Sequence, residues 1–291
     1  ITCINSMDAS YIPIAEARGF TTHWIKFYEK GVAFSNKSGI VFVYLICSFE
    51  YYVLFYRFLH YFSVSRRCYI MKFKLKDPGS AITHGIAMLL AAAGATPLIV
   101  KAARSADMLH VFAVSVFILT MILLYLASTL YHSVDSTAKV NRRLKKMDHM
   151  MIFVMIAGSY TPVCLIVLHG RTGYILCALV WTVAIIGMIL KGCWINCPKW
   201  LSSVIYIGMG WLCVLAFVPI FHNLPRAGFG WLLAGGIIYT IGGVIYALKL
   251  PIFNAKHKNF GSHEVFHIFV MLGSMCHFVV MYFFVAGMGI H

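Results

Sequence analysis

The chain has 291 residues, of which 61% are hydrophobic and 11% are charged, and its formal net charge is +15. Its mean hydropathy of +0.83 indicates more apolar surface than a soluble protein of this length could bury, so much of the chain should lie in a bilayer. This composition excludes an ordinary soluble enzyme and predicts an integral membrane protein.

Residues 1–70 differ from the rest of the chain and are interpreted as an atypical N-terminal extension. The sequence MKFKLKDPGSAITHG, which begins at Met71, is typical of a natural start, and no signal-peptide pattern precedes it. Residues 39–62 are long and apolar enough to span a bilayer, but Glu50 and Arg57 would be costly at membrane depth. The extension is therefore either translated upstream sequence or an added interfacial or spanning helix.

Residues 71–291 are expected to form the functional membrane domain, because they contain seven apolar runs near the roughly 20 residues that a bilayer requires. The runs are Ala81–Val100, Met108–Leu130, Met150–Leu168, Gly173–Leu190, Leu201–Phe221, Gly228–Leu248 and Val265–Gly289. Hydrocarbon offers no water to backbone groups, so these runs are expected to be helices, and they lack the alternating pattern of a barrel. The predicted fold is an all-α integral membrane protein with a seven-helix bundle.

Basic residues are distributed unevenly between the two sides of these runs. One side carries Lys72, Lys74, Lys76, Lys139, Arg142, Arg143, Lys145, Lys146, Lys191, Lys199, Lys249, Lys256 and Lys258, and the other carries Lys101, Arg104, Arg171 and Arg226. By the positive-inside rule, the segment before the first helix is predicted to be cytoplasmic and the C-terminus to be outside. Basic residues in such short loops are expected to contact anionic lipid rather than nucleic acid.

The nine cysteines show no spacing typical of a zinc ribbon. Cys193 and Cys197 come nearest, but they lie in a predicted cytoplasmic loop, where a disulfide is disfavoured. We interpret the cysteines as small apolar fillers. The sequence also contains no nucleotide-binding loop and no convincing internal repeat.

Ionisable residues at the ends of the spans are more informative, because such groups are costly in a membrane and usually functional. The second run ends with ASTLYHS, which brings Ser128 and His132 to the cytoplasmic side. The third run starts on that side with KKMDHMMIF, which carries Asp148, and the seventh starts there with GSHEVFH, which carries His263 and His267. Three distant stretches of sequence are therefore predicted to meet at one depth of one leaflet.

His263 and His267 lie four residues apart, so on a helix their imidazoles share a face and could bind one tetrahedral ion. His132 would add a third nitrogen from another helix and leave the fourth position for water, which is the pattern of a catalytic zinc. Zinc is therefore the expected cofactor, and it would lower the pKa of its bound water to about 7. Asp148 is the expected group to orient or deprotonate that water.

The string HEVFH also matches the H-E-x-x-H signature of zinc proteases, in which the glutamate is the general base. We interpret Glu264 as a less favoured candidate for the base than Asp148, because the signature usually lies in soluble proteins and here opens a membrane span. His277 lies ten residues, or about 15 Å, beyond His267 and cannot share its ion. It is expected to bond a neighbouring helix or to line a cavity.

Structural interpretations of these residues stay open at this point. The three histidines could pack between helices without a metal, and Asp148 could pair with Lys145 or Lys146. Ser128 could bond the carbonyl four residues earlier in its helix. Pro162, in IAGSYTP, could simply bend its helix or could open a cavity.

Five segments of the sequence resemble the hemolysin III family, the bacterial branch of the progestin and adiponectin receptor superfamily. They are SAITHG (80–85), STLYH (128–132), KMDHMMIFVMIAGSYTP (146–162), GGVIYALKLP (242–251) and FGSHEVFHIFVMLGSMCHF (260–278). The resemblance covers about residues 75–288, in order and with the family's spacings. It implies a seven-helix protein of a bacterial cell membrane, with zinc bound near the cytoplasmic face by His132, His263 and His267.

The resemblance also implies that Asp148 lies close to the zinc-bound water and that Ser128 belongs to the same cluster. Relatives in the superfamily include receptors with ceramidase-like hydrolysis, so we expect a zinc-dependent hydrolase whose substrate or ligand is a membrane lipid amide or ester. The alternatives are a pore-forming cytolysin with a structural zinc and a lipid sensor without chemistry. A pore should show a continuous polar stripe, whereas the polar residues are predicted to cluster only at the cytoplasmic end.

Overall fold

The computed structural model describes residues 75–104, 107–248 and 261–289. The predicted extension of residues 1–70, with its apolar stretch 39–62, lies outside the described residues. The helices are α3 (Pro78–Ala103), α4 (Met108–Ser133), α5 (Ala138–Pro162), α6 (Arg171–Cys193), α7 (Lys199–Gly210), α8 (Phe217–Asn223), α9 (Arg226–Leu248) and α10 (Ser262–Val280). Three short segments with other helical periods accompany them, η1 (Val163–Val167), η2 (Trp211–Ala216) and η4 (Met281–Val285).

Within the described residues these elements make seven helical stretches that are long and apolar enough to cross a membrane, which confirms the predicted fold. Helix α5 continues into η1, α10 continues into η4, and α7, η2 and α8 together form a single span. Large apolar side chains cover the outside of the bundle; Leu90 is 64% exposed and Leu215 is 70% exposed. Such a surface suits lipid rather than water.

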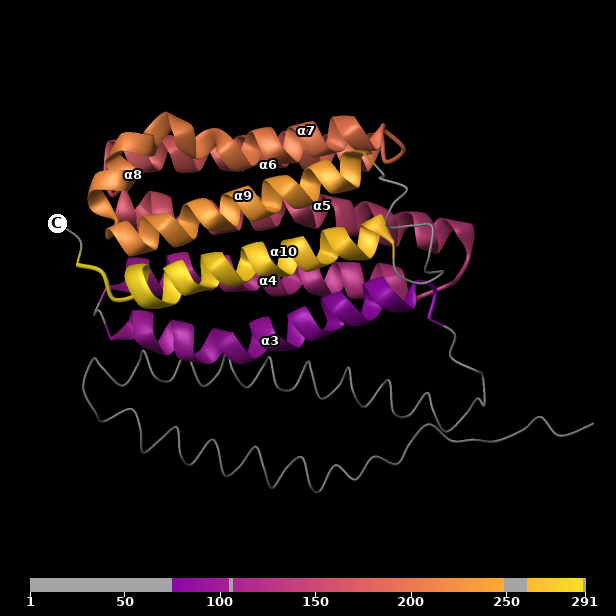
Figure 1. Ribbon diagram of the computed structural model, residues 1–291, viewed down its shortest axis with the longest axis horizontal. Coiled ribbons are helices and arrows are strands. Elements are labelled where there is room, and N and C mark those ends of the chain that lie inside the picture. The colour runs from indigo at the N-terminus through magenta and orange to yellow at the C-terminus, as the bar shows by residue number, and fades with distance from the viewer. Residues whose placement is uncertain (1–74, 105–106, 249–260, 290–291) are drawn as a thin grey trace, which may run out of the picture. The chain divides into compact units, whose positions relative to one another are not determined.

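The helices lie side by side along the long axis of the bundle (Figure 1), and their contacts form a closed ring. Helix α3 packs on α4, α4 on α5, α5 on α6 and α7, α7 on α9 and α9 on α10, and α10 returns to pack on α3. The first and last helices described are therefore neighbours. The beginnings of α3, α5, α7 and α10 lie at one end of the ring, which we call the basic end because Lys76, Arg142, Lys146 and Lys199 lie there.

Helix α5 begins twelve residues earlier than the apolar pattern indicates, at Ala138 rather than Met150. The Thr137 hydroxyl caps it by accepting a hydrogen bond from the Val140 amide. The first three turns are strongly basic, so they lower the local hydropathy without interrupting the helix. As a result, Asp148 lies well inside α5 rather than at its first turn.

Two spans change helical period where a proline or a tyrosine interferes with the regular backbone pattern. Pro162 ends the α-helical part of α5, and the following residues form the π-helical η1. Helix α7 ends at Gly210, whose carbonyl accepts a hydrogen bond of 2.6 Å from the Tyr160 hydroxyl. The same hydroxyl accepts a hydrogen bond of 2.8 Å from the Cys213 amide, so Tyr160 bridges the start of η2.

Glycines allow close approach between helices, for example at two buried positions of α5 and α6. A Cβ atom at Gly158 of α5 would lie 1.9 Å from Thr120 Oγ1 of α4. A Cβ atom at Gly187 of α6 would lie 2.3 Å from the Phe153 ring of α5. Larger residues at these positions would push the helices apart.

The interpretation of the cysteines as apolar fillers is wrong for Cys197. Cys193 and Cys197 are free thiols, and Cys197 is buried beside the amine of Lys191, which donates a hydrogen bond of 2.8 Å to Cys197 Sγ. Lys191 also donates to the Ser202 hydroxyl at 2.5 Å, which lies 3.1 Å from the same sulfur. The spacing of the cysteines gave no indication of a lysine that returns from the preceding helix.

Candidate metal centre

Three histidines from α4 and α10 meet at the basic end of the bundle. His132 lies in the last turn of α4, and His263 and His267 lie in the first two turns of α10. One nitrogen from each imidazole lies within 4.8 Å of a nitrogen of the other two, an arrangement that could hold a metal ion. The helical spacing of His263 and His267 places both on one face of α10. The ring of His132 contacts the rings of both residues.

The distance between two of these nitrogens matches the one expected around a tetrahedral ion. His132 Nε2 and His263 Nε2 are 3.2 Å apart. Two nitrogens bound to one zinc at 2.0–2.1 Å with tetrahedral angles would be separated by about 3.3 Å. His132 and His267 are each no more than 3% exposed, so the donor set also has the shielding that metal sites in proteins commonly have.

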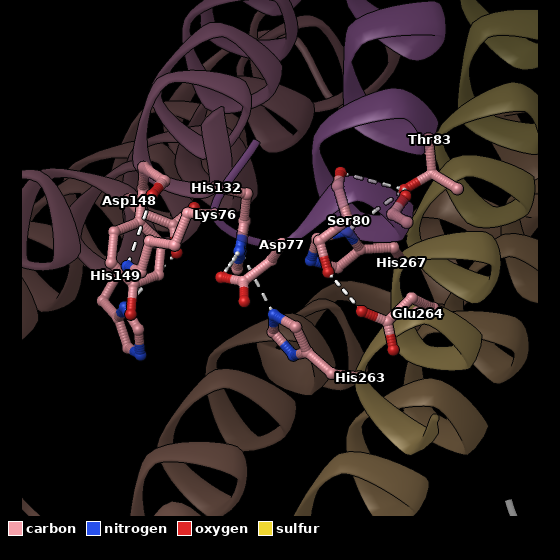
Figure 2. Close-up of polar contacts among 12 residues, drawn as sticks. Lys76, Asp77, Ser80, Thr83, His132, Asp148, His149, His263, Glu264 and His267 are labelled. Atoms are coloured by element: carbon pink, nitrogen blue, oxygen red, sulfur yellow. Dashed lines mark hydrogen bonds and ion pairs between the residues drawn. The ribbon is translucent and has the colours of Figure 1, made fainter. Parts of the chain in front are cut away.

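His132 is oriented by a carboxylate that the sequence analysis did not assign to the site. Asp77, immediately before α3, accepts a hydrogen bond from His132 Nδ1 at 3.0 Å. Its backbone amide donates to the carbonyl of the same histidine at 2.9 Å. A carboxylate on Nδ1 fixes the tautomer and leaves Nε2 unprotonated and free to bind a metal. Figure 2 shows Asp77 beside His132, with the ring of His263 below them.

His267 is held by two residues of α3. The ring of His84 stacks on that of His267 with centroids 3.6 Å apart and planes 9° apart. The Thr83 hydroxyl donates to carbonyls in its own helix, so its oxygen can accept the long 3.4 Å contact from His267 Nδ1. This arrangement again leaves Nε2 as the nitrogen with a free lone pair.

Asp148 and Ser128 line the same cavity as His263 and His267, although neither belongs to the group of residues that could hold a metal ion. Asp148 is 8% exposed, and its carboxylate lies 3.4 Å from Nδ1 of the adjacent His149 (Figure 2). The ion pair with Lys145 or Lys146 that the sequence left open is not found among the described residues. Lys146 instead donates a hydrogen bond to the carbonyl of Gly192.

Ser128 is 1% exposed, and its hydroxyl oxygen has no hydrogen-bond partner within the described residues. The alternative that it bonds the carbonyl four residues earlier is therefore wrong. A buried hydroxyl without a partner is costly, so it indicates a place for a ligand or water in the cavity.

Glu264 has both carboxylate oxygens engaged in holding the start of α10. Ser80 of α3 donates to Oε1 at 2.6 Å (Figure 2). The Gly261 amide donates to Oε2 at 2.8 Å. The second of these bonds caps the helix. A carboxylate with two such partners is poorly placed to accept a proton from water.

The cavity continues from the histidines into the middle of the bundle. It is bordered by α4, α5, α7, α9 and α10 and reaches His277, so the expectation that this residue lines a cavity is confirmed. Beside it, the Tyr125 hydroxyl donates to Ser274 Oγ at 2.7 Å, and the Tyr239 hydroxyl lies 2.9 Å from the same oxygen. The expectation that polar residues cluster only at one end is therefore wrong, because tyrosine hydroxyls deep in the bundle add polar groups that an apolar pattern conceals.

Sequence reasoning missed Asp77 and His84. Asp77 was only one of a few acids near the spans, and the proline after it gave the better signal, since Asp-Pro commonly begins a helix. His84 lies in SAITHG, one of the segments that carry the family resemblance, but nothing in its spacing relates it to His267.

Residues 72–278 match the family described as Haemolysin-III related. Hemolysin-3 of Bacillus cereus is 39% identical over 215 residues, which cover 74% of this chain and 94% of that protein. The Hemolysin-3 homolog of Bacillus subtilis (strain 168) is 36% identical over 213 residues, covering 73% of this chain and 96% of that protein. The Adiponectin receptor protein of Drosophila melanogaster is 26% identical over 166 residues, covering 50% of this chain and 35% of that protein.

The chain therefore belongs to the haemolysin III-related family, and the adiponectin receptor links it to the progestin and adiponectin receptor superfamily. Its seven spans and its bacterial relatives define a multi-pass protein of the bacterial cell membrane. Its group of three histidines could hold a metal ion.

Proposed function

We propose that this protein is a zinc-dependent hydrolase that cleaves an amide or ester bond of a membrane lipid. The observation that carries the proposal is the composition of one cavity wall. Two of the three histidines that could hold a metal, His263 and His267, border a largely apolar cavity together with the buried carboxylate of Asp148 and the unpartnered hydroxyl of Ser128. The third histidine, His132, lies beside this wall, with its ring against the rings of His263 and His267. Three neutral imidazoles suit zinc among the common divalent ions, although other ions also accept them.

The cavity favours a lipid as the substrate. Its walls are mainly apolar, with side chains such as Leu124, Ile156 and Val270, which would hold an acyl chain and exclude water. The polar end lies at the basic end of the bundle, where a lipid headgroup would enter if this end faces the cytoplasm as the charge distribution predicts. Basic residues such as Lys76 and Lys199 would then contact neighbouring anionic lipid.

Zinc, when bound by the three imidazoles, would supply an activated water and polarise the carbonyl of the scissile bond. Asp148 accepts the proton of the attacking water at its carboxylate and passes it to the leaving amine or alcohol. The Ser128 hydroxyl donates a hydrogen bond to the carbonyl oxygen of the lipid and orients it. Asp77 keeps His132 in the tautomer that the site requires.

The first experiment measures the metal content of the purified full-length chain. We expect about one zinc per chain in the wild type and a loss in His132→Ala. His110→Ala is the matched control, because His110 is also buried in α4 but lies at the other end, where it contacts the Met288 carbonyl at 2.8 Å. Absence of metal from folded wild-type protein would contradict the proposal.

The second experiment tests the chemistry with zinc-loaded protein in detergent micelles. The probes are an N-acylsphingosine, which has an amide, and a monoacylglycerol, which has an ester. We expect release of fatty acid from one of them, and a decrease of about a hundredfold or more in Asp148→Asn at unchanged zinc content. Zinc-loaded protein that cleaves neither probe but binds them would favour the lipid sensor. Dye leakage from vesicles without any cleavage would favour the cytolysin.

A further inference from the structure

His277 is a polar side chain of the cavity that the proposed chemistry does not use. It lies in α10 ten residues after His267, so the two rings are separated by about 15 Å along the helix axis. Both ring nitrogens are shielded from solvent, and neither has a hydrogen-bond partner within the described residues. His277 nevertheless borders the same cavity as His263 and His267 of the metal centre.

The ring of His277 is held in place by α9. The Tyr239 ring packs edge-on against it, with centroids 5.3 Å apart. On the same face of α9, a Cβ atom at Gly235 would lie 2.4 Å from the His277 ring, so the absence of a side chain there makes room for the histidine. Tyr239 and Gly235 of α9 therefore determine the position of the His277 ring.

We call the end of the cavity beside His277 the deep end. The other polar groups around it are hydrogen-bonded to one another or to the backbone. Tyr239 and Tyr125 share Ser274, as described above. The Trp211 indole nitrogen donates to the Thr240 hydroxyl at 2.9 Å, and that hydroxyl donates to the Gly236 carbonyl at 2.8 Å. Among the described residues, His277 is thus the polar group of the deep end that has no partner.

The chemistry of a neutral imidazole defines what could satisfy it. One ring nitrogen donates a hydrogen bond and the other accepts one, which matches a hydroxyl group, itself both a donor and an acceptor. An unbonded polar group in a membrane interior is costly, and a charged ligand group at this depth would be costlier still. An uncharged hydroxyl on a lipid chain would give the imidazole a hydrogen-bond partner without placing a charge at this depth.

We propose that the cavity takes a lipid with two polar groups, one at the metal centre and a hydroxyl group about 15 Å further along the chain, bonded by His277. This inference rests on the proposed function only for the orientation of the lipid, with its carbonyl or carboxylate at the histidines of the metal centre. Binding of the hydroxyl requires no turnover. His277 is then a specificity-determining residue that selects chains hydroxylated near their middle.

The test is competition against tritiated octadecanoic acid on the zinc-loaded full-length protein in detergent. The competitors are octadecanoic acid, 12-hydroxyoctadecanoic acid and 2-hydroxyoctadecanoic acid, which has the same composition as the second but carries its hydroxyl beside the carboxylate. We expect the wild type to bind the 12-hydroxy acid about fivefold to tenfold more tightly than the other two. Equal affinities of the wild type for all three acids would overturn the inference, and so would failure to bind any of them.

Four variants test whether the preference depends on His277. In His277→Phe the preference should vanish, whereas His222→Phe, a matched substitution of an exposed histidine in α8, should keep it. Tyr239→Phe should also keep the preference, because it removes a hydroxyl that already has a partner. A preference that persists in His277→Phe would overturn the inference. If His277→Phe does not fold, the substitute is Gly235→Ala, whose added methyl group on α9 would displace the His277 ring. This variant should also lose the preference, and a preference that persists in Gly235→Ala would overturn the inference.

The outcome is separable from that of the hydrolase experiment. A wild type that prefers the 12-hydroxy acid but releases no fatty acid from the amide or ester probe would retain this subsite and lose the proposed chemistry. A wild type that cleaves the probes but shows no preference among the acids would retain the proposed chemistry and lose this subsite.

Discussion

Asp77 and His132 are joined twice, by a hydrogen bond of 3.0 Å between carboxylate and imidazole and by one of 2.9 Å between backbone amide and carbonyl. The pair links the beginning of α3 to the end of α4. One residue therefore fixes both the position of the histidine backbone and the direction of its ring.

The first prediction follows from this pair. Asp77→Asn should lower the affinity for zinc by about 10–100-fold, because the imidazole loses the charged acceptor that orients it and raises its basicity. The measurement is a zinc titration against a competing chelator. Asp107→Asn is the matched control, since Asp107 lies 3.4 Å from His110 at the opposite end of α4. Equal affinity in the wild type and Asp77→Asn would show that the carboxylate does not orient a metal ligand.

The second prediction separates the two carboxylates that could serve as the base. Glu264→Ala should destabilise the fold by about 1 kcal/mol, because the start of α10 loses its cap. Hydrolysis per zinc-loaded molecule should stay within a few-fold of the wild type. Thermal unfolding and fatty acid release, measured on the same preparation, check both parts. A loss of hydrolysis as large as that of Asp148→Asn, at full zinc content, would identify Glu264 as the base instead.

The third prediction concerns the contact between α4 and α5. Gly158→Ala should lower the stability by about 1–3 kcal/mol, because its Cβ atom would overlap the side chain of Thr120. The control is Gly230→Ala in α9, where no atom lies within 4 Å of the added Cβ, and this variant should be neutral or slightly stabilising. Unfolding midpoints in one detergent compare the two. Similar midpoints would mean that the helices separate without cost.

The fourth prediction concerns the thiol of Cys197. Burial opposes its ionisation, but the hydrogen bonds from Lys191 and Ser202 hold the pKa of Cys197 below its usual value. A lowered pKa means that the thiolate forms at lower pH than in an ordinary cysteine, and Lys191→Met should shift its formation to higher pH. The check is the pH dependence of N-ethylmaleimide labelling, resolved by peptide mass spectrometry, with the exposed Cys193 as internal reference. Identical pH profiles for Cys197 in the two proteins would rule out stabilisation by Lys191.

The order of the spans was predictable because hydropathy and charge report directly on the membrane. The order also showed that the ends carrying His132, His263 and His267 share one side, which is sufficient to propose a shared site. It does not give the rotation of each helix about its own axis. For this reason the stacking of His84 on His267 could not be predicted.

Other features depend on contacts that no local pattern records. The chain of hydroxyls through Tyr125, Ser274 and Tyr239 joins three helices, and each residue alone is compatible with an apolar span. The true start of α5 was missed because a basic helix outside the apolar region has no hydropathy signal. The capping role of Glu264 was hidden by the zinc-protease signature in which it lies.

The closing of the ring by α10 against α3 has a consequence for biosynthesis. The site combines the second described span with the last, and residues of the first span support both. Because a chain emerges from the ribosome N-terminus first, the donor set stays incomplete until the final span has inserted. A metal held by all three histidines could therefore be captured only after this span has inserted, and it would stabilise that state over every partly inserted one.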